Sequence, residues 1–472
     1  MSESMCEVRC YVSTRSLALC LVLIFSCLGF SLAQSTTSSG RPNIVIIVAD
    51  DLGWNDIGYH NSSIRTPTLD RLARSGVVFD RFYVYPLCSP TRAGLMTARS
   101  SMRTGIIYSV VRPWANYGLA LDEHLLPESF RAAGYQTAII GKWHLGHDRV
   151  QFLPHNRGFD FFYGYVNGAI DYWTHKRFEA VDWQQNGVTD DVRGYSTLLL
   201  GEQAVHFIEN RDTTRPFLLY LAFNAPHGPL QAPESSIAKY AELTDKKRQV
   251  FSAMVDVLDS TIDKVMQALR ENGLEENTIV LFFSDNGGFP PQGGDNRPLR
   301  GRKETVFEGG IRVPAFIRWP GAVVARTSRQ VMTVLDVFPT LAEAARVPVL
   351  NSKPLDGKSL WHEIVTGEVR LREDLFFAVE HDGLQHAVIH GRWKLVQIEK
   401  TQTCEVSNML FDLEADPNEA VDLSQQQPDL VKLLSERIQQ WRKLHPDGGI
   451  RLEIAPHPGW VPPADWAAAA RR

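Results

Sequence analysis

The sequence predicts an α/β fold in which a large mixed, mostly parallel sheet is covered by helices on both faces. The first observation is a set of continuous apolar runs, which are typical of strands buried on both sides. The second is that segments with helical periodicity lie between these runs, as in βαβ units. The third is a change of pattern after about residue 370. That change predicts a smaller C-terminal α+β subdomain with a short antiparallel sheet.

The main elements are expected in the following order. The four apolar strands are expected at 43–48, 135–140, 217–223 and 278–283. The helices between them are expected at 68–75, 125–133 and 245–271. Because this strand and helix pattern stops near residue 370, we expect a main domain at 34–370 and a C-terminal subdomain with a tail at 371–472.

The C-terminal subdomain is expected to contain short strands and one helix. The strands are expected at 387–397 and 408–413, with a turn at Gly391-Arg392, and the helix at 429–444. No function is assigned to the tail that follows.

Residues 1–33 are typical of a secretory signal peptide. Two arginines precede an uncharged run at 17–32, which is short for a membrane-spanning helix and has the length of a signal-peptide apolar region. The small-x-small site at 31–33 makes Gln34 the expected first residue of the mature chain. An uncleaved N-terminal anchor is the alternative. We therefore expect an exported protein, periplasmic or secreted, or lysosomal if the source is an animal.

The composition, the net charge and the cysteine count exclude some classes of protein and of binding partner. The 472 residues are 44% hydrophobic and 22% charged, with a net charge of −5, which is ordinary globular composition. The chain has no basic run of the kind that binds nucleic acid, so neither a nucleic-acid partner nor stable membrane association is expected. Signal-peptide cleavage leaves two of six cysteines, Cys88 and Cys404, which excludes a disulfide scaffold.

Polar residues follow each of the four predicted strands. Because ligands of open α/β sheets bind outside the carboxyl ends of the strands, we expect these residues to share one site. In chain order they are Asp50 and Asp51, then Lys142 and His144, then His227, then Asp285 and Asn286.

Two kinds of chemistry are present among the candidate site residues. The first set offers only oxygen ligands, which hard cations such as Ca²⁺ and Mg²⁺ prefer; it consists of Asp50, Asp51, Asp285 and Asn286. Three carboxylates brought together would raise one another's pKa unless a cation neutralised them. The second set is cationic and needs an anionic ligand; it consists of Arg92, Lys142, His144, His227 and Lys303.

The stretch around Cys88 is the most specific in the chain. Ser89 is expected to cap a helix, and Pro90 suits the first helical position. Cys88 would then lie beside the positive end of that helix, which favours a bound anion. The pattern Cys-x-Pro-Thr-Arg at 88–92 resembles the signature of the sulfatase family, in which the cysteine is converted to formylglycine. That signature usually ends in Thr-Gly-Arg, whereas this chain has Ala98 in place of the glycine.

Other stretches extend the resemblance over most of residues 41–415. The run that ends in Lys142-Trp143-His144 is similar to the second sulfatase signature, and the glycine-punctuated block around Lys303 is also similar to the family pattern. The resemblance is closest to the arylsulfatase B, or N-acetylgalactosamine-4-sulfatase, subgroup. The stretches that carry this are 122–127, 141–146, 157–160 and 298–303.

The resemblance implies a fold, a cofactor and a reaction. The fold is an alkaline-phosphatase-like α/β/α sandwich. One Ca²⁺ per chain, with Mg²⁺ as the other candidate, is held by Asp50, Asp51, Cys88, Asp285 and Asn286. A formylglycine-generating enzyme converts Cys88, and the hydrated aldehyde attacks the sulfur of a sulfated saccharide, N-acetylgalactosamine-4-sulfate-like, or of an aryl sulfate. Charge on the sulfuryl group is stabilised by Arg92, Lys142, His144 and Lys303. His227 protonates the leaving alcohol.

Two other functions stay open at this point. Some formylglycine enzymes cleave phosphorus esters, so a phosphodiesterase or phosphonate monoester hydrolase is one alternative. Turnover of an aryl sulfate against an aryl phosphodiester separates these two enzymes. The other alternative is a non-catalytic protein that binds sulfated glycans. It is disfavoured because the fold alone would not require the complete set of site residues.

Overall fold

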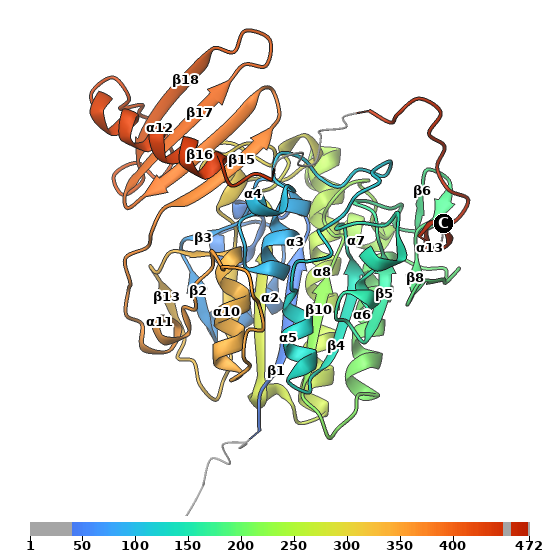
Figure 1. Ribbon diagram of the computed structural model, residues 1–472. Helices are drawn as coiled ribbons and strands as arrows, with labels where there is room; N and C mark the ends of the chain where they lie inside the picture. The colour runs from blue at the N-terminus through green and yellow to red at the C-terminus, as the bar shows by residue number, and fades with distance from the viewer. Residues whose placement is uncertain (1–39, 447–454, 471–472) are drawn as a thin grey trace, which may run out of the picture. The chain divides into compact units, whose positions relative to one another are not determined.

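The computed structural model describes residues 40–446 and 455–470 (Figure 1). The predicted signal peptide at 1–33 lies outside these residues. The chain divides after Gly40, and every element described below belongs to the unit Arg41–Arg472. In the described ranges, no helix combines the length and the apolar character needed to cross a lipid bilayer.

The main sheet has a parallel centre formed by the four predicted strands. They lie side by side in the order β11 (Thr278–Ser284), β1 (Asn43–Ala49), β10 (Phe217–Ala222) and β4 (Gln136–Lys142). Almost every residue of these strands is buried, as the continuous apolar runs predicted.

Shorter strands extend the sheet on both sides. Within the described ranges its ten strands follow the order β13-β2-β12-β11-β1-β10-β4-β5-β8-β9. The outer strands are β2 (Val77–Phe79), β5 (Phe161–Tyr165), β8 (Gln184–Gln185), β9 (Val188–Thr189), β12 (Ala315–Arg318) and β13 (Arg326–Ser328). β12 pairs antiparallel to β11 and β8 pairs antiparallel to β5, so the sheet is mixed, as expected.

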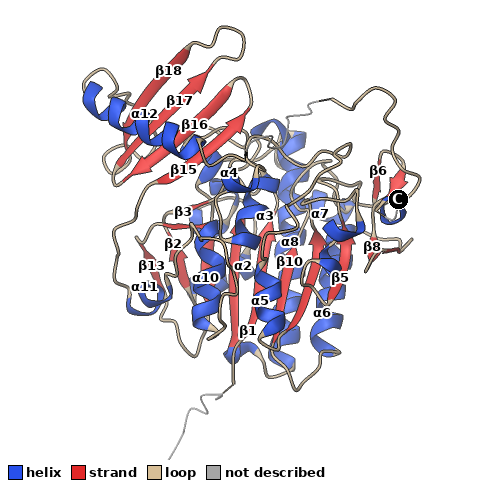
Figure 2. Cartoon of the chain, in the orientation of Figure 1, coloured by secondary structure: helices blue, strands red, loops and turns tan. Residues whose placement is uncertain are grey.

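Helices cover both faces of this sheet (Figure 2). Side chains of β1 alternate between them: Ile44 and Ile46 pack in one core, and Val45 and Ile47 in the other. The first face is covered by α3 (Cys88–Thr97), α5 (Leu126–Ala132) and α10 (Val334–Ala344). The second is covered by α2 (Pro67–Arg74), α6 (Ser196–Glu209) and α8 (Lys246–Glu271). The predicted α/β/α architecture is confirmed.

The remaining short elements lie in the connections. The helices are α4 (Ser101–Thr104), α7 (Glu234–Ile237), α9 (Glu308–Ile311) and α11 (Trp361–Thr366). The strands are the pair β3 (Phe82–Tyr83) and β14 (Met332–Thr333), and the hairpin β6 (Lys176–Arg177) and β7 (Ala180–Val181).

The C-terminal subdomain is an antiparallel sheet covered by one helix (Figure 1). Its strands are β15 (Leu375–Glu380), β16 (Leu384–His390), β17 (Trp393–Glu399) and β18 (Val406–Asp412), in that order. The turn between β16 and β17 falls at the predicted Gly391-Arg392. Leu434 and Ile438 of α12 (Pro428–Arg442) pack on Val388 and Leu395 of the sheet. β15 was not among the expected strands.

The described part of the tail packs against the β6–β7 hairpin. It contains the short helix α13 (Trp466–Ala469), and Trp466 is buried. The indole Nε1–H of Trp466 donates to the Arg177 carbonyl over 3.0 Å, and Asp465 forms a β-bridge with Val181. The tail therefore fixes the hairpin from outside.

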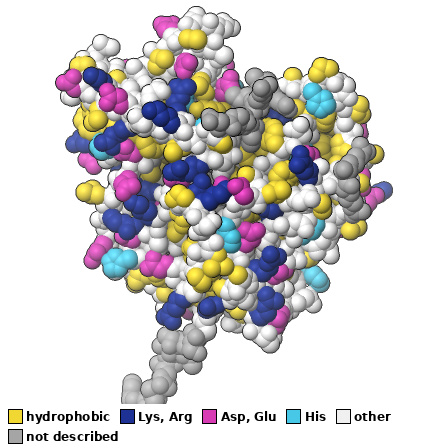
Figure 3. All heavy atoms as spheres, in the orientation of Figure 1, with side chains coloured by type: hydrophobic (Ala, Val, Ile, Leu, Met, Phe, Trp, Pro, Cys, Tyr) yellow, Lys and Arg dark blue, Asp and Glu magenta, His cyan; other side chains and the backbone are white. Residues whose placement is uncertain are grey.

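Charged side chains of both signs are interspersed with apolar ones on the face shown in Figure 3. A dense set of charges occurs instead inside the molecule, at the carboxyl ends of the central strands.

Candidate active site

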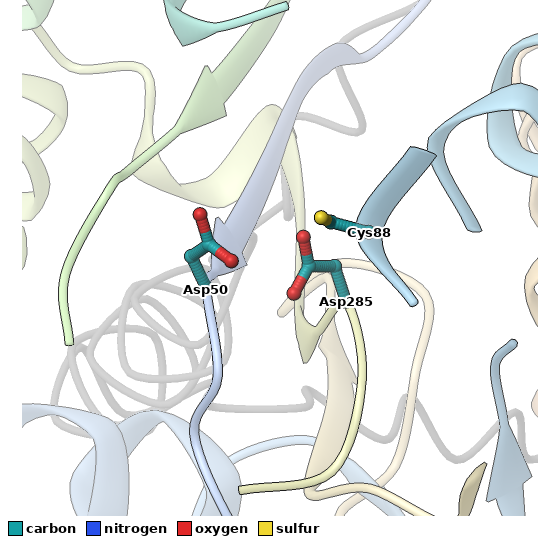
Figure 4. A group of neighbouring side chains, drawn as sticks. All are labelled: Asp50, Cys88 and Asp285. Carbon is teal, nitrogen blue, oxygen red and sulfur yellow. The ribbon is translucent and has the colours of Figure 1, made fainter. Parts of the chain in front are cut away.

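The register of the central strands brings the predicted site residues together. Ala49 of β1 pairs with Ser284 of β11, so Asp50 and Asp285 follow neighbouring positions. Ala222 of β10 pairs with Gly141 of β4, directly before Lys142. Figure 4 shows Asp50, Asp285 and Cys88 pointing toward one another from the ends of β1 and β11 and the start of α3. One ligand atom of each lies within 4.8 Å of the others.

A glycine makes the placement of Lys142 possible. Gly141 has a φ of 117°, in the region that favours glycine. A Cβ at this position would lie 1.9 Å from the carbonyl oxygen of Ala222, so a side chain would push β4 away from β10. The position of Lys142 and the pairing of β4 with β10 therefore require glycine at position 141.

Each buried carboxylate of the cluster has a cationic partner. Arg92 donates to Asp285 Oδ2 through Nε at 3.1 Å and Nη2 at 2.8 Å. Lys142 Nζ lies 2.6 Å from Asp50 Oδ2. Lys303 Nζ lies 2.7 Å from Asp51 Oδ1. All six side chains are buried, so their formal charges balance in a medium where unpaired charge is costly.

Two buried oxygens in this cluster accept no hydrogen bond from the described residues. They are Asp50 Oδ1 and Asn286 Oδ1. Unpaired buried acceptors are rare and expensive, which indicates a ligand. Burial raises the pKa of Asp285, and the charge of Asp50 raises it further. The donors are carboxylate and amide oxygens, so the residues present fit a hard divalent cation.

Cys88 is held in place at the first turn of α3. The helix begins at Cys88 with Leu87 as its N-cap, so the prediction that Ser89 caps it is wrong. The Ser89 hydroxyl instead donates to the carbonyl of His144 at 2.9 Å and accepts from the Val111 amide at 3.1 Å. These tertiary hydrogen bonds use the side chain that a cap would need.

The environment of the Cys88 thiol disfavours the thiolate. Burial raises its pKa, against the opposing charges of Lys142 and Lys303. Since the thiolate is the nucleophilic form of cysteine, the unmodified side chain is a poor nucleophile here. Among the described residues both thiols are free, with Cys88 buried and Cys404 exposed.

His144 offers an acceptor to the site. Its Nε2 lies 3.1 Å from the Val111 carbonyl, which fixes the proton on that nitrogen, and its buried Nδ1 has no partner among the described residues. Burial lowers the pKa of His144 well below its ordinary value, and Lys142 and Arg92 act in the same direction. The residue has a φ of 61° and Asp51 a φ of 70°. Two site residues thus hold a left-handed backbone, a form of strain typical of functional sites.

His227 lies on the other side of the cluster. Its Nδ1 is 2.6 Å from the Gly228 carbonyl and its Nε2 is 3.8 Å from Asp51 Oδ2. Burial lowers the pKa of His227, and Lys303 lowers it further. The free site therefore holds a neutral imidazole with its proton on Nδ1.

A cavity of about 570 Å³ opens onto this cluster, and its wall includes Cys88, His144, His227 and Lys303. The sequence did not single out the other polar residues of the wall, because most of them come from segments without a motif. They include Arg112, Arg177, Gln292, Glu304, Glu380 and His381. A larger cavity of about 980 Å³ beside α10 and α12 contains none of the predicted site residues.

Comparison with known proteins gives the family. The family model for sulfatases matches residues 42–347, and the model for the C-terminal region of N-sulphoglucosamine sulphohydrolase matches residues 302–444. The chain is 33% identical to arylsulfatase J of Mus musculus, over 86% of this chain and 77% of the relative. The chain belongs to the sulfatase family. As a member, it is an enzyme that hydrolyses sulfate esters.

Further relatives of this sulfatase are of more than one type. It is 34% identical to N-acetylgalactosamine-6-sulfatase of Mus musculus, over 76% of this chain and 72% of that protein. Among solved structures it is similar to Ps i-CgsB, with a TM-score of 0.81, 32% identity, and coverage of 86% of this chain and 94% of the other. Ps i-CgsB has also been solved in complex with k-i-k-neocarrahexaose. The arylsulfatase B-like subgroup stays a prediction.

Proposed function

We propose that this enzyme removes sulfate from a sulfated saccharide that resembles an N-acetylgalactosamine sulfate, and that it accepts aryl sulfates as activated substrates. The observation that carries the proposal is the convergence of Cys88 with Asp50 and Asp285 within 4.8 Å, at a cavity whose wall also includes His144, His227 and Lys303. The name of one relative, N-acetylgalactosamine-6-sulfatase, supports a sulfated amino sugar as the substrate class, and the name arylsulfatase J supports aryl sulfates as substrates.

The nucleophile in this proposal is formylglycine made from Cys88. Its hydrated form supplies one hydroxyl that attacks sulfur and a second that expels sulfate afterwards. The buried, protonated thiol supports this modification, since the unmodified cysteine would react poorly. A formylglycine-generating enzyme is therefore an expected partner during maturation.

The proposed cation is a single Ca²⁺ held by Asp50, Asp51, Asp285, Asn286 and residue 88, with Mg²⁺ as the other candidate. Bound there, it would act as a Lewis acid on the sulfate ester. Its charge would add to a cluster in which three carboxylates already balance three basic side chains. The net positive charge then favours an anionic ester.

The chain's own residues have separate roles in the proposal. Lys142 and Lys303 face the thiol closely enough to act on its pKa, so they can stabilise charge that develops beside residue 88. Arg92 orients Asp285 through two hydrogen bonds. The unprotonated Nδ1 of His144 can accept a hydrogen bond from a hydroxyl at residue 88. His227 faces the cavity and is the proposed proton donor to the leaving alcohol.

Export is part of the same proposal. Residues 1–33 would direct the catalytic domain and its C-terminal subdomain to the periplasm or the medium, or to the lysosome in an animal cell, and would then be removed.

Mass spectrometry of the peptide that contains residue 88, combined with turnover of an aryl sulfate, tests the proposal. We expect an aldehyde at residue 88 and sulfate release that Cys88→Ala abolishes. The matched control is Cys404→Ala, which changes an exposed thiol far from the cluster in sequence. Exhaustive chelation should stop turnover, and added Ca²⁺ should restore it. An active enzyme with an unmodified thiol would contradict the proposal, and faster cleavage of an aryl phosphodiester than of the sulfate would favour the phosphodiesterase alternative.

A further inference from the structure

Two arginines lie on the cavity wall beside the reaction centre. Arg112 follows Val111. The amide of Val111 donates to the Ser89 hydroxyl, and its carbonyl lies 3.1 Å from His144 Nε2. Arg177 comes from the β6–β7 hairpin and lines the same cavity. Neither belongs to the charge cluster that surrounds Cys88.

One N–H donor of each guanidinium group lacks a hydrogen-bond acceptor. The Nε–H of Arg112 and that of Arg177 are buried, and neither finds a hydrogen-bond acceptor among the described residues. No carboxylate of the described chain lies within ion-pair distance of either group. The charge of Asp182 acts on Arg177, but that carboxylate already accepts from the amides of Val166 and Asn167.

The charge of Arg112 also acts on Arg177. Burial lowers the pKa of Arg177 below its ordinary value; Asp182 opposes this shift, and the charge of Arg112 adds to it. Two like charges held together at a cavity wall cost free energy unless an anion lies between or beside them. A planar fork of N–H donors is well suited to the oxygens of a sulfate or a carboxylate.

We propose that Arg112 and Arg177 form a second anion site, and that the preferred substrate is a saccharide that carries a further sulfate or carboxylate besides the sulfate that is cleaved. The inference rests on the proposed function. It adds that the preferred substrate carries at least two acidic groups. The acidic side chains of the same cavity are Asp171, Glu304 and Glu380, and none of them forms an ion pair with either arginine. Asp171 accepts a hydrogen bond from Gln231, and Glu304 accepts one from Arg302.

The hairpin that carries Arg177 is built to hold it in place. The guanidinium carbon lies 4.7 Å from the centre of the Phe178 ring, and that ring contacts Trp460 of the tail. The Trp466 indole donates to the backbone carbonyl of Arg177. These contacts orient the side chain before a substrate arrives, which reduces the entropy lost on binding.

Steady-state kinetics with matched substrates tests the second anion site. The substrates are a monosulfated disaccharide, the same disaccharide with a second sulfate, the same disaccharide with a carboxylate in place of that sulfate, and an aryl sulfate. For the wild-type enzyme we expect kcat/KM to be at least about tenfold higher on the substrates with two acidic groups, mostly through KM. The more favoured of the two identifies which acidic group the site recognises.

Variants then assign the effect to the two arginines. Arg112→Gln and Arg177→Gln should each reduce, by about tenfold, the ratio of kcat/KM on the two-anion substrate to that on the monosulfated one. The double variant should remove the preference, and Arg→Lys should retain part of it. The control Arg193→Gln changes an exposed arginine that does not line the cavity, and it should leave the ratio unchanged.

The outcomes separate the two proposals. Equal wild-type turnover of the matched disaccharides, or an unchanged ratio in the double variant, would overturn the second anion site while leaving the sulfatase function in place. Absence of sulfate release from all four substrates would overturn the proposed function, and the second site with it.

Discussion

At the scale of single residues, the proposed proton donor His227 lies in an environment that favours its neutral form. Its Nδ1 is engaged with the Gly228 carbonyl, and its Nε2 lies between Asp51 and the cavity. Burial and the charge of Lys303 both lower its pKa. The protonated form is therefore populated below the ordinary imidazole value, and it is lost as the pH rises through the lowered pKa.

His227→Ala should slow the release of poor leaving groups more than that of good ones. The expected loss is about 10²-fold or more on a sugar sulfate, because general acid catalysis is typically of that size. An activated aryl sulfate should lose much less, since its phenolate leaves without a proton. The measurement is a plot of log kcat/KM against the pKa of the leaving group for both enzymes.

For the wild type we expect activity on sugar sulfates to fall as the pH rises through the lowered pKa of His227, and the variant should lack this pH dependence. His206→Gln is the control, because this histidine is exposed on α6. Equal losses on all leaving groups would argue against a proton donor at position 227.

The backbone conformation of Ala98 lowers the stability of the folded protein. It ends α3 with a φ of 55°, at the position where the resembling family usually has glycine. An L-residue in this conformation costs about 1–2 kcal/mol, and glycine does not carry that cost. Ala98→Gly should therefore raise the free energy of unfolding by about 1 kcal/mol, after the larger chain entropy of glycine in the unfolded state is subtracted. Chemical denaturation measures this, and a less stable variant would contradict it.

The sequence predicted the residues of the cluster well, because each follows a buried strand or lies in a specific motif. Asp50 and Asp285 are examples: parallel strands place their carboxyl ends at one edge of the sheet. It failed for Ser89, whose hydroxyl bonds to residues that are distant in sequence. It also gave no signal for Arg112 and Arg177, because nothing local marks a side chain whose partner is a ligand.

At the scale of elements, a buried charge triad connects the C-terminal sheet to the loop that carries Lys303. Lys394 on β17 lies 2.9 Å from Glu308 Oε1 and 2.8 Å from Glu419 Oε1, and all three side chains are fully buried. Glu308 begins α9, which lies in the connection between β11 and β12, as Lys303 does. The C-terminal subdomain therefore supports part of the active site from behind.

Lys394→Met should destabilise the protein by about 3–5 kcal/mol, because it leaves the buried Glu419 without a cation and Glu308 with only Arg312, at 3.7 Å. Burial already raises the pKa of Glu419, and loss of Lys394 would raise it further. The variant should therefore be less destabilised at low pH, where the carboxyls are protonated. Thermal unfolding at two pH values measures both effects. Lys400→Met is the control, since its ion pair with Glu405 is exposed; a loss no larger than that of the control would contradict the role of the triad.

Elements were predictable where burial alone decided them. The four central strands are apolar throughout, and α8 begins at the expected place because Asp245 accepts from the Lys247 amide. The short hairpin β6–β7 was not predicted, since its two-residue strands are fixed by the tail. Asp465, the tail residue that bridges to Val181, is about 280 residues away in sequence, beyond the reach of local patterns.

At the scale of the whole molecule, buried histidines make the stability of the folded state depend on pH. Burial lowers the pKa of His60 and of His147 to about 4 and that of His386 to about 3. In the unfolded chain each binds a proton near its ordinary value, so the unfolded state takes up more protons as the pH falls below about 6.5. These groups therefore give their full stability above that pH and lose it in acid.

Buried carboxyl groups act in the opposite sense at lower pH. Burial raises the pKa of Asp56, Asp182 and Asp259 to about 6. Their folded forms bind protons that the unfolded chain binds only near its ordinary value of about 4, so they gain stability as the pH falls below about 6. The histidines and the carboxyl groups therefore change the stability in opposite directions below about pH 6. The difference in stability between the wild type and a histidine variant removes the carboxyl contribution, because both proteins share it.

His386 allows this difference to be measured. It is buried on β16 between Trp441 of α12 and Tyr108, whose hydroxyl lies 3.2 Å from Nε2, so it lies where the C-terminal subdomain meets the main domain. Gln at this position keeps a polar group for Tyr108 but cannot titrate.

We expect the stability advantage of the wild type over His386→Gln to shrink by up to about 1.4 kcal/mol for each pH unit below 6.5, because one proton is taken up only by the unfolded wild-type chain. Calorimetric Tm and unfolding enthalpy at pH 7.5, 6.5 and 5.5 give this difference, and the exposed His206→Gln should show none. A difference that stays constant over this range would mean that His386 is not held neutral by the fold.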